Sequence, residues 1–253
     1  LFTDEEHSFI CCLSSMNLAK YDEWKDTDSV ELATWFLDGV MQEFIDKSSG
    51  RESLKRTHKH ASKGRALGLG VMGWHTFLQQ KGLPFNSIAS TAWTHTIFSD
   101  IRGKAEKASM DLAKEYGEPL WCKGTGMRNT HLTAIAPNKS TALILGGVSE
   151  GINPQPAFVF TQSTPSGEVV RIDPSFLELL KEKGLYVNED DLETKKLLSD
   201  ISGHKGSIQH RPEFTADEKA VFRTAFEINM YDHIDLVDYR QKFVCQAQSC
   251  NLF

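Results

Sequence analysis

The stretch THLTAIAPNKST (residues 130–141) decides the fold that this sequence predicts. Its first part, 130–136, alternates between polar and apolar residues in the manner of β-structure and stops at Pro137. A polar turn through Thr141 follows, and an apolar run at 142–145 comes after the turn. A strand, a polar turn and an apolar run in this order are expected where an α/β protein places a binding site at the carboxyl end of a strand.

Hydrophobic periodicity on both sides of this stretch predicts further helices and strands. Apolar residues three or four apart indicate helices at 29–47, 74–81 and 87–116, two short helices within 174–202, and one beyond Pro212 that runs through Val237. Short apolar or alternating segments indicate strands at 8–18 and 243–253 and a hairpin over 158–172 that is broken at 164–167. No repeat or linker separates these elements, so one α/β domain over residues 1–253 is expected.

Three glycines in the segment RALGLGVMG (residues 65–73) have the spacing of a dinucleotide-binding fingerprint. No strand clearly precedes them, and no acidic residue follows at the required distance, so cofactor binding is the weaker interpretation. Close backbone packing of a short strand against the helix that begins at Trp74 is favoured. The basic stretch before it, 51–65, is interpreted as a solvated face or loop rather than a phosphate-binding patch.

Composition limits the classes of protein to which the chain can belong. With 253 residues, of which 40% are apolar and 25% charged, it is long enough for a sizeable core and typical of a globular protein. The formal net charge of −6 gives no general attraction to nucleic acid or to an anionic membrane. The longest apolar stretch, 133–148, is interrupted by Asn138 and Lys139, so no membrane span is expected.

The N-terminal residues and the cysteines indicate the cellular compartment of the protein. The N-terminus is acidic where a signal peptide is basic and then apolar, so a cytoplasmic location is expected. Five cysteines, a sparse and odd-numbered set, favour reduced thiols over a disulfide framework. The chain does not begin with Met, which suggests a processed product or an excerpt of a longer protein.

The polar turn is the first candidate site. Its backbone N–H groups and hydroxyls can hold a phosphate without a net positive charge on the protein. The alternative is that the turn only caps a following helix, which is the commoner use of such residues. The candidate substrate-binding residues are Pro137, Asn138, Lys139, Ser140 and Thr141.

Cys11 and Cys12 are the second candidate site. Adjacent residues of a strand point to opposite faces, so these two thiols are not expected to pair with each other. Buried, inert thiols are the simpler interpretation by composition. A redox role requires a second cysteine within reach, and Cys122, Cys245 and Cys250 are the other cysteines of the chain. No Cys/His spacing typical of zinc is present, and no metal site is predicted.

Several linked motifs resemble the large, catalytic subunit of ribonucleotide reductase, in the C-terminal part of its barrel domain. These motifs are CCLSSMNL (residues 11–18), RNTHLTAIAP (128–137), NKST (138–141) and GGVSEGINP (146–154). The segments RALGLGVMG (65–73) and QAQSCNLF (246–253) are similar to that family as well, so the resemblance covers nearly the whole chain.

The resemblance implies part of a ten-stranded α/β barrel that reduces the 2′-carbon of a ribonucleoside diphosphate by radical chemistry, for deoxyribonucleotide synthesis and DNA replication. Cys11 falls where the family keeps one of two cysteines that supply the reducing electrons and become a disulfide, whereas Cys12 aligns with a variable position. The turn 137–141 falls where the family holds the phosphates of its substrate. Lys139 departs from the acidic residue often found there and adds a positive charge beside the anion.

The resemblance also implies partners. The radical comes from a small subunit with a metal centre, and an external dithiol of the thioredoxin or glutaredoxin type reduces the disulfide again, so this chain binds no cofactor of its own. The family's radical cysteine, second reducing cysteine, paired tyrosines and allosteric site fall outside this sequence. A complementary N-terminal chain and an oligomeric assembly are therefore expected.

The string APNKST (136–141) favours a class I enzyme over the adenosylcobalamin-dependent class. A non-catalytic nucleotide-binding or assembly module that keeps the fold is the alternative function. A glycyl-radical relative is a more remote one.

Overall fold

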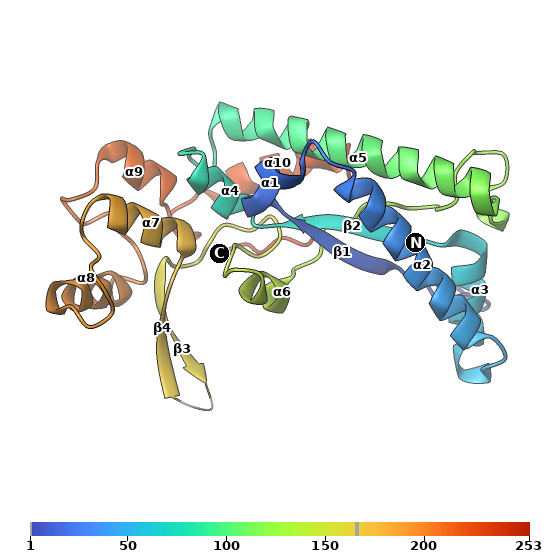
Figure 1. Cartoon of the computed structure of the whole chain (residues 1–253), viewed down its shortest axis with the longest axis horizontal. Coiled ribbons are helices and arrows are strands. Elements are labelled where there is room, and N and C mark those ends of the chain that lie inside the picture. The colour runs from blue at the N-terminus through green and yellow to red at the C-terminus, as the bar shows by residue number, and fades with distance from the viewer. Residues whose placement is uncertain (1, 165–166) are drawn as a thin grey trace.

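The computed structural model describes residues 2–164 and 167–253 as helices around a small parallel sheet, with an antiparallel hairpin beside it (Figure 1). In chain order the elements are β1 (Cys12–Asn17), α1 (Tyr21–Trp24), α2 (Ser29–Ser48), α3 (Lys55–Gly64), β2 (Leu67–Met72), α4 (Trp74–Gln80), α5 (Ile88–Tyr116), α6 (Lys139–Ile144), β3 (Val159–Thr164), β4 (Gly167–Ile172), α7 (Pro174–Glu182), α8 (Leu192–Gly203), α9 (Ala216–Val221) and α10 (Met230–Gln241). This mixture confirms the predicted α/β class.

β1 and β2 run parallel and pair along their full lengths of six residues. Two single parallel bridges extend the array, one between Leu69 and Thr133 and one between Ile135 and Gln248. Four extended segments therefore follow one another in the order β1, β2, the segment around Thr133 and the segment around Gln248. Parallel neighbours need long crossover connections, and the helices between these segments supply them.

Gly70 of β2 lets neighbouring backbone come close, and Gly68 leaves room for neighbouring side chains. A Cβ on Gly70 would collide with the carbonyl oxygen of Ala134, and one on Gly68 would lie 3.0 Å from the Ala134 Cβ and 3.1 Å from the Cys11 sulfur. This is the close packing that the sequence predicts, although its partners are the neighbouring extended segments rather than helix α4. Gly73, with a φ of +80°, makes the turn into α4.

Helices α2 and α5 pack against each other, and α2 also packs on β1 (Figure 1). α5 begins after Ser87, whose hydroxyl accepts a hydrogen bond from the Ser90 N–H at 3.1 Å, and ends at Gly117 with a φ of +82°. Both helices form close to their predicted bounds. Leu37 and Met41 of α2 and Ile97 of α5 are buried in the main core, whereas the apolar side chain of Phe36 in α2 is 68% exposed. No helix among residues 2–164 and 167–253 combines the length and hydrophobicity that a bilayer crossing requires.

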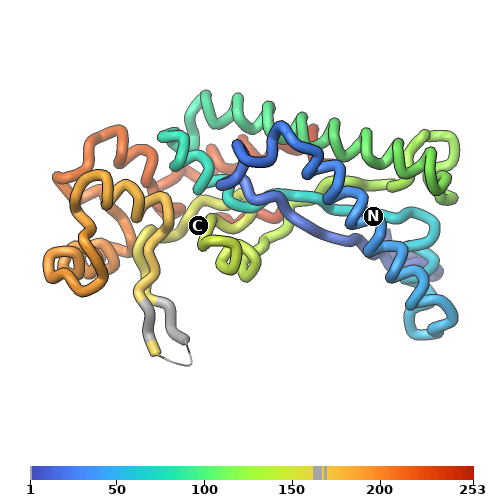
Figure 2. The backbone as a smooth tube through the Cα atoms, in the orientation of Figure 1, coloured from blue at the N-terminus to red at the C-terminus, as the bar shows by residue number. Residues whose placement is uncertain are grey.

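A second apolar cluster lies among β3 and helices α7 to α9, which gather at the opposite end of the molecule from α3 (Figure 2). Its largest members are Phe158, Phe176, Phe214 and Phe222. β3 and β4 pair antiparallel, which confirms the predicted hairpin. The predicted break at 164–167 includes residues 165 and 166, which lie outside the described residues.

The basic stretch is predicted to be a solvated face or a loop, and the loop is wrong because most of the stretch is helix α3. Long-range contacts hold the helix against the N-terminal segment. Lys63 Nζ lies 2.9 Å from His7 Nε2, Lys59 pairs with Glu6 at 3.3 Å, and His60 is buried. Contacts with residues some fifty positions away stabilise a helix that has few apolar residues of its own.

The segments 130–136 and 243–253 are predicted strands, but in the structure they make only the single bridges described above. Their hydrogen bonds change partner within a few residues. The Ala134 N–H donates to the Leu69 carbonyl and the Ile135 N–H donates to the Ala247 carbonyl, each at 3.2 Å. A segment that divides its donors between two neighbours cannot form a long ladder with either.

The helix predicted beyond Pro212 is also corrected, because it divides into α9 and α10. Between them the Ala225 N–H donates to the Gln155 carbonyl at 2.7 Å, outside any helix. α10 then starts anew with Asn229, whose side chain accepts a hydrogen bond from the Tyr231 N–H at 3.0 Å. A tertiary contact therefore overrides the helical periodicity here.

Candidate functional site

The turn 137–141 lies near the carboxyl ends of β1 and β2 (Figure 1), and α6 starts inside it at Lys139. Asn138 precedes the helix with a φ of 59° and a ψ of 24°, a left-handed conformation that Asn adopts more readily than most residues. The side chains of Lys139, Ser140 and Thr141 are exposed. Their backbone N–H groups belong to the first turn of α6, where no intrahelical acceptor exists.

The side chain of Asn138 is bound to the sheet. Its Nδ2 donates to Ser15 Oγ at 2.7 Å and to the Val71 carbonyl at 3.3 Å. Ser15 belongs to β1 and Val71 to β2, so one amide group joins the turn to both parallel strands. Among the predicted binding residues, Asn138 therefore has its side chain engaged within the protein.

Cys11 lies immediately before β1 and is half-buried. Gln246 Nε2 donates a hydrogen bond to the Cys11 sulfur at 3.7 Å, and Gly68 leaves room beside it. Burial raises the pKa of the Cys11 thiol to about 11. The thiol therefore keeps its proton at neutral pH.

Cys12, the first residue of β1, packs against the main core, and burial raises the pKa of its thiol as well. Cys11 lies on the other face of the strand, together with Leu13. This follows because both side chains lie next to the position that a Cβ on Gly68 would take. The predicted opposite orientation of the two thiols is confirmed.

One face of β1 connects Cys11 with the turn. Cys11 and Ser15 are four positions apart, which is about 13 Å at the rise of a strand, and Ser15 contacts Asn138. Leu13, which lies between them, is 55% exposed, so the described residues leave this face open. The structure thus places the two predicted sites on one open face, at its two ends and not in contact.

A groove of about 1090 Å³ opens beside the turn. Its walls are α6, the hairpin β3–β4 and the start of α7, and Lys139 and Ser140 lie on its edge. Lys139 Nζ lies 3.8 Å from Glu150 Oε1, and the Lys139 side chain is 83% exposed. This loose pair leaves the ammonium group able to approach an anion at the turn.

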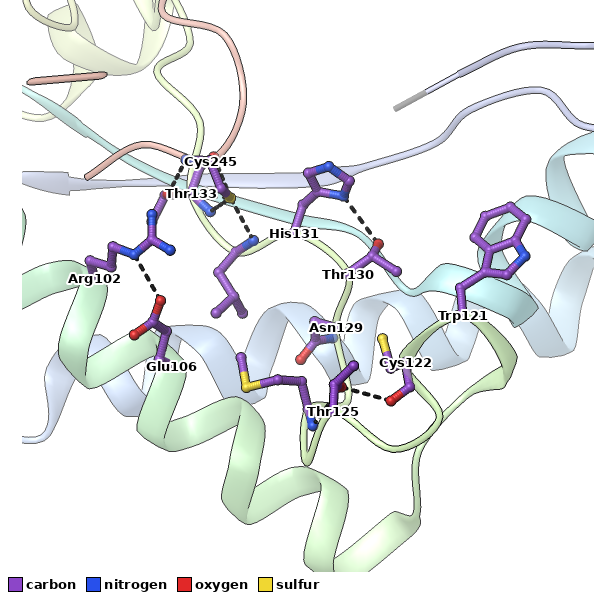
Figure 3. Close-up of a pocket in the computed structure, with 12 residues that line it drawn as sticks. Arg102, Glu106, Trp121, Cys122, Thr125, Asn129, Thr130, His131, Thr133 and Cys245 are labelled. Carbon is purple, nitrogen blue, oxygen red and sulfur yellow. Dashed lines mark hydrogen bonds and ion pairs between the residues drawn. The ribbon is translucent and has the colours of Figure 1, made fainter. Parts of the chain in front are cut away.

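A smaller pocket of about 240 Å³ lies at the amino end of the segment that leads to the turn (Figure 3). The sulfur of Cys245 accepts hydrogen bonds from the N–H groups of Leu132 and Thr133, each at 3.2 Å. On the α5 side, Arg102 pairs with Glu106 at 2.7 Å. Sequence reasoning named Cys245 only as one of the remaining cysteines, since nothing local indicates these backbone donors.

Asp200, His204 and His210 form a cluster at α8 whose candidate ligand atoms lie within 4.8 Å of one another. Asp200 Oδ2 already contacts Arg211 Nη1 at 2.9 Å and His210 Nε2 at 2.7 Å, and the two imidazole rings stack with centroids 3.8 Å apart. The guanidinium of Arg211 thus occupies the position beside the carboxylate that a metal cation would need. The spacing of these three residues in the sequence matches no metal-binding motif, so the sequence does not predict the cluster.

A buried charge network joins α2 to the start of β2 and to the segment before the turn. Asp38 accepts hydrogen bonds from Arg65 Nη2 at 2.8 Å, Arg128 Nε at 3.0 Å and Asn129 Nδ2 at 2.8 Å. Burial opposes ionisation of the carboxyl, but hydrogen bonds from Arg65, Arg128 and Asn129 and the charge of Arg65 outweigh it and lower the pKa of Asp38. No local pattern in the sequence indicates this network, because its members are up to 91 positions apart.

The amino-acid sequence matches a known protein family over the whole chain. The family model for the ribonucleotide reductase barrel domain matches residues 1–124 and 120–253. The chain is 36% identical over 253 residues to a ribonucleoside-diphosphate reductase large subunit of Invertebrate iridescent virus 3, covering 99% of this chain and 39% of that one. It is 35% identical over 254 residues to the corresponding subunit of Invertebrate iridescent virus 6, covering 99% of this chain and 26% of the relative.

A solved structure agrees with these relatives. The class Id ribonucleotide reductase alpha subunit of Actinobacillus ureae superposes with a TM-score of 0.89 at 42% identity, covering 99% of this chain and 45% of that one. The chain thus spans between 26% and 45% of the length of these relatives. The resemblance stated from the sequence is confirmed: the chain belongs to the ribonucleotide reductase family, and its residues correspond to part of the barrel domain of the large subunit.

Proposed function

We propose that this chain is part of the catalytic large subunit of a class I ribonucleoside-diphosphate reductase, which converts ribonucleotides to deoxyribonucleotides for DNA replication. One observation carries the proposal: the face of β1 that bears Cys11 leads to Ser15, which contacts the turn at Asn138. A thiol and a turn with exposed hydroxyls therefore share one open face. The 42% identity to a class Id alpha subunit supports the class.

The turn 137–141 binds the 5′-phosphates of the substrate in this proposal. The amide groups at the start of α6 and the hydroxyls of Ser140 and Thr141 are suited to phosphate oxygens. Lys139 adds a positive charge at the surface of a chain whose net charge is −6. The acidic chain thus has a local site for an anion that its overall charge does not attract.

Cys11 is one of two thiols that reduce the substrate. Two thiols that form a disulfide give up two protons and two electrons. In the net reaction the ribonucleotide accepts them, its 2′-hydroxyl leaves as water, and a 2′-deoxyribonucleotide remains. The raised pKa of Cys11 supports this role, because the proton is on the sulfur at neutral pH and is ready to be delivered with the electron.

The remaining components are supplied by partners. A small subunit with a metal centre generates the radical, a second cysteine of the large subunit pairs with Cys11, and a dithiol protein of the thioredoxin or glutaredoxin type reduces the disulfide. This chain binds no cofactor itself. We place the assembled, oligomeric enzyme in the cytoplasm, with neither a membrane nor a nucleic acid as partner.

Residues 1–253 act as one portion of the barrel domain and are completed by an N-terminal half of the large subunit. The exposed apolar side chains on and before β1 support this, since Phe9 is 58% and Leu13 55% exposed in the described chain. The sequence relatives are more than twice as long as the aligned region, which leaves ample chain to cover this face. The alternative, a non-catalytic module that keeps the fold, predicts nucleotide binding without turnover.

The test is a reductase assay on the complete enzyme with Cys11→Ser and, as the matched control, Cys12→Ser. Cys11→Ser should abolish multiple turnover while substrate binding persists, because the hydroxyl cannot form a disulfide. Cys12→Ser, which changes the neighbouring thiol on the other face, should retain turnover. Full turnover by the Cys11 variant would remove Cys11 from the reaction, and a wild-type enzyme that binds nucleotide but never reduces it would favour the non-catalytic module.

A further inference from the structure

Strand β1 is bound to both ends of helix α6. At the start of the helix, Asn138 Nδ2 donates to Ser15 Oγ at 2.7 Å. At its end, Asn17 Nδ2 donates to the carbonyl of Leu145 at 3.3 Å. Ser15 and Asn17 are two positions apart and therefore lie on the same face of the strand. Two neighbouring side chains of one strand thus hold one short helix.

Helix α6 has few other contacts, namely the packing of Ala142 on Met72 and Val148 and the hydrogen bond from Asn138 to the Val71 carbonyl. It has six residues, a length at which a helix is not stable alone in water. Of these six, only Ala142 is buried, whereas Leu143 is 42% and Ile144 79% exposed. The residue before the helix, Asn138, makes no side-chain cap, because its amide is turned to the strands. The orientation of α6 therefore depends strongly on its polar contacts with β1.

We infer that Ser15 and Asn17 are positioning residues, which set the place of the phosphate-binding turn relative to Cys11. This inference rests on the proposed function of the turn. Ser15 and Asn17 lie in β1, and Cys11 directly precedes this strand, so one short stretch of chain carries the reducing thiol and the anchors of the turn. Neither anchor touches the phosphate itself. They act by keeping the turn in its binding conformation before the substrate arrives.

Loss of an anchor should weaken substrate binding more than it slows the reaction. If the turn populates its binding conformation only part of the time, the apparent affinity falls by that fraction. Once the substrate is bound, the chemistry at Cys11 proceeds as before, so KM rises while kcat changes little. Loss of one neutral hydrogen bond corresponds to a change of about two- to tenfold.

The experiment uses the complete enzyme with four variants of β1. Ser15→Ala removes the acceptor for Asn138. Asn17→Asp keeps the oxygen that accepts the Ala19 N–H at 3.1 Å but removes the donor to Leu145. Ser14→Ala is the matched control, because Ser14 is a serine of the same strand whose hydroxyl makes no hydrogen bond within the described residues. Ser15→Thr retains a hydroxyl and should restore the wild-type values.

Two readouts are needed. Steady-state kinetics gives KM and kcat for a ribonucleoside diphosphate, and amide hydrogen exchange without nucleotide reports the order of residues 139–145. We expect Ser15→Ala and Asn17→Asp each to raise KM about two- to tenfold and to speed exchange in α6, with kcat within about twofold. Ser14→Ala and Ser15→Thr should match the wild type in both readouts.

The contrary outcomes separate this inference from the proposed function. Unchanged exchange and unchanged KM in both anchor variants would overturn the anchoring. Suppose that the anchor variants speed exchange without changing KM, whereas replacing Ser140 and Thr141 does raise KM. This result would overturn the positioning role of Ser15 and Asn17 and leave the phosphate site in place. If neither the anchors nor Ser140 and Thr141 affect KM, the turn is not the phosphate site, and the proposed function of the turn fails with the inference.

Discussion

Asp38 and Arg65 form an ion pair of 2.8 Å in the interior, and both side chains are only 5% exposed. Replacing one member of a buried pair leaves the other charge without a partner, which costs about 3–5 kcal/mol. Asp38→Asn should therefore lower the free energy of unfolding of the large subunit by this amount, measured by denaturant or thermal unfolding. Glu43→Gln, which breaks the exposed pair with Lys47, is the control and should change stability by less than about 1 kcal/mol.

The same ion pair predicts that the free energy of unfolding depends on pH in the acidic range. The fold lowers the pKa of Asp38, so its stabilisation is fully present above the unfolded-state value of about 3.9 and is lost as the pH falls through the lower, folded value. The wild type should lose stability in that acidic range more steeply than Asp38→Asn. Parallel pH profiles for the two proteins would show that folding does not lower the pKa of Asp38.

Gly70 should tolerate no side chain. Its added Cβ would collide with the backbone carbonyl of Ala134, so Gly70→Ala must push two extended segments apart. We expect a loss of at least about 1–3 kcal/mol. Gly39→Ala is the matched control: nothing lies within 4 Å of its added Cβ in helix α2, and it should gain up to about 1 kcal/mol. Equal effects at both positions would contradict the close approach.

Ser140 and Thr141 should contribute directly to substrate affinity. Ser140→Ala combined with Thr141→Ala removes two hydroxyl donors to phosphate, worth roughly 1–3 kcal/mol in total. The dissociation constant of a ribonucleoside diphosphate should rise about 5- to 150-fold, as measured by equilibrium binding to the complete enzyme. A nucleoside without phosphates should bind wild type and variant alike, and an unchanged diphosphate affinity would place the site elsewhere.

Cys11 should react slowly with alkylating agents at neutral pH. Since the thiolate is the nucleophile and the pKa of Cys11 is raised to about 11, its iodoacetamide labelling rate should still rise about tenfold per pH unit between pH 8 and 9.5. A peptide with the sequence of residues 8–18 should approach its plateau in this range, near the ordinary thiol value of about 8.5. Peptide mapping by mass spectrometry gives both rates, and the same plateau in protein and peptide would contradict the buried thiol.

Regular elements with a strong local signal could be predicted from the sequence. α5 occupies nearly its predicted span, because Ser87 caps its start, Gly117 ends it, and apolar residues recur along its length. The hairpin β3–β4 also forms where predicted. α3 could not be predicted, since it has few apolar residues of its own and is held by contacts with His7 and Glu6.

The candidate site also has residues that the sequence predicts and residues that it does not. The polar turn and Cys11 stand out from the residues and from the family resemblance, and the structure puts them on one face. The residues that hold the turn and the core in place cannot be recognised from the sequence. Nothing around Ser15 indicates that its hydroxyl meets Asn138, and nothing around Asp38 indicates two buried arginines. Such contacts are set by tertiary structure, which a single sequence read along its length does not contain.

The attachment of α6 to β1 also has a consequence for folding. The contact between Ser15 and Asn138 closes a loop of 123 residues, and the hydrogen bond from Gln246 to Cys11 closes one of 235. Contacts between residues so distant in the sequence are made only after their loops have closed, and they slow folding. The turn and the thiol environment are therefore among the last regions to mature, so recovery of nucleotide binding during refolding would report the final step rather than the first collapse.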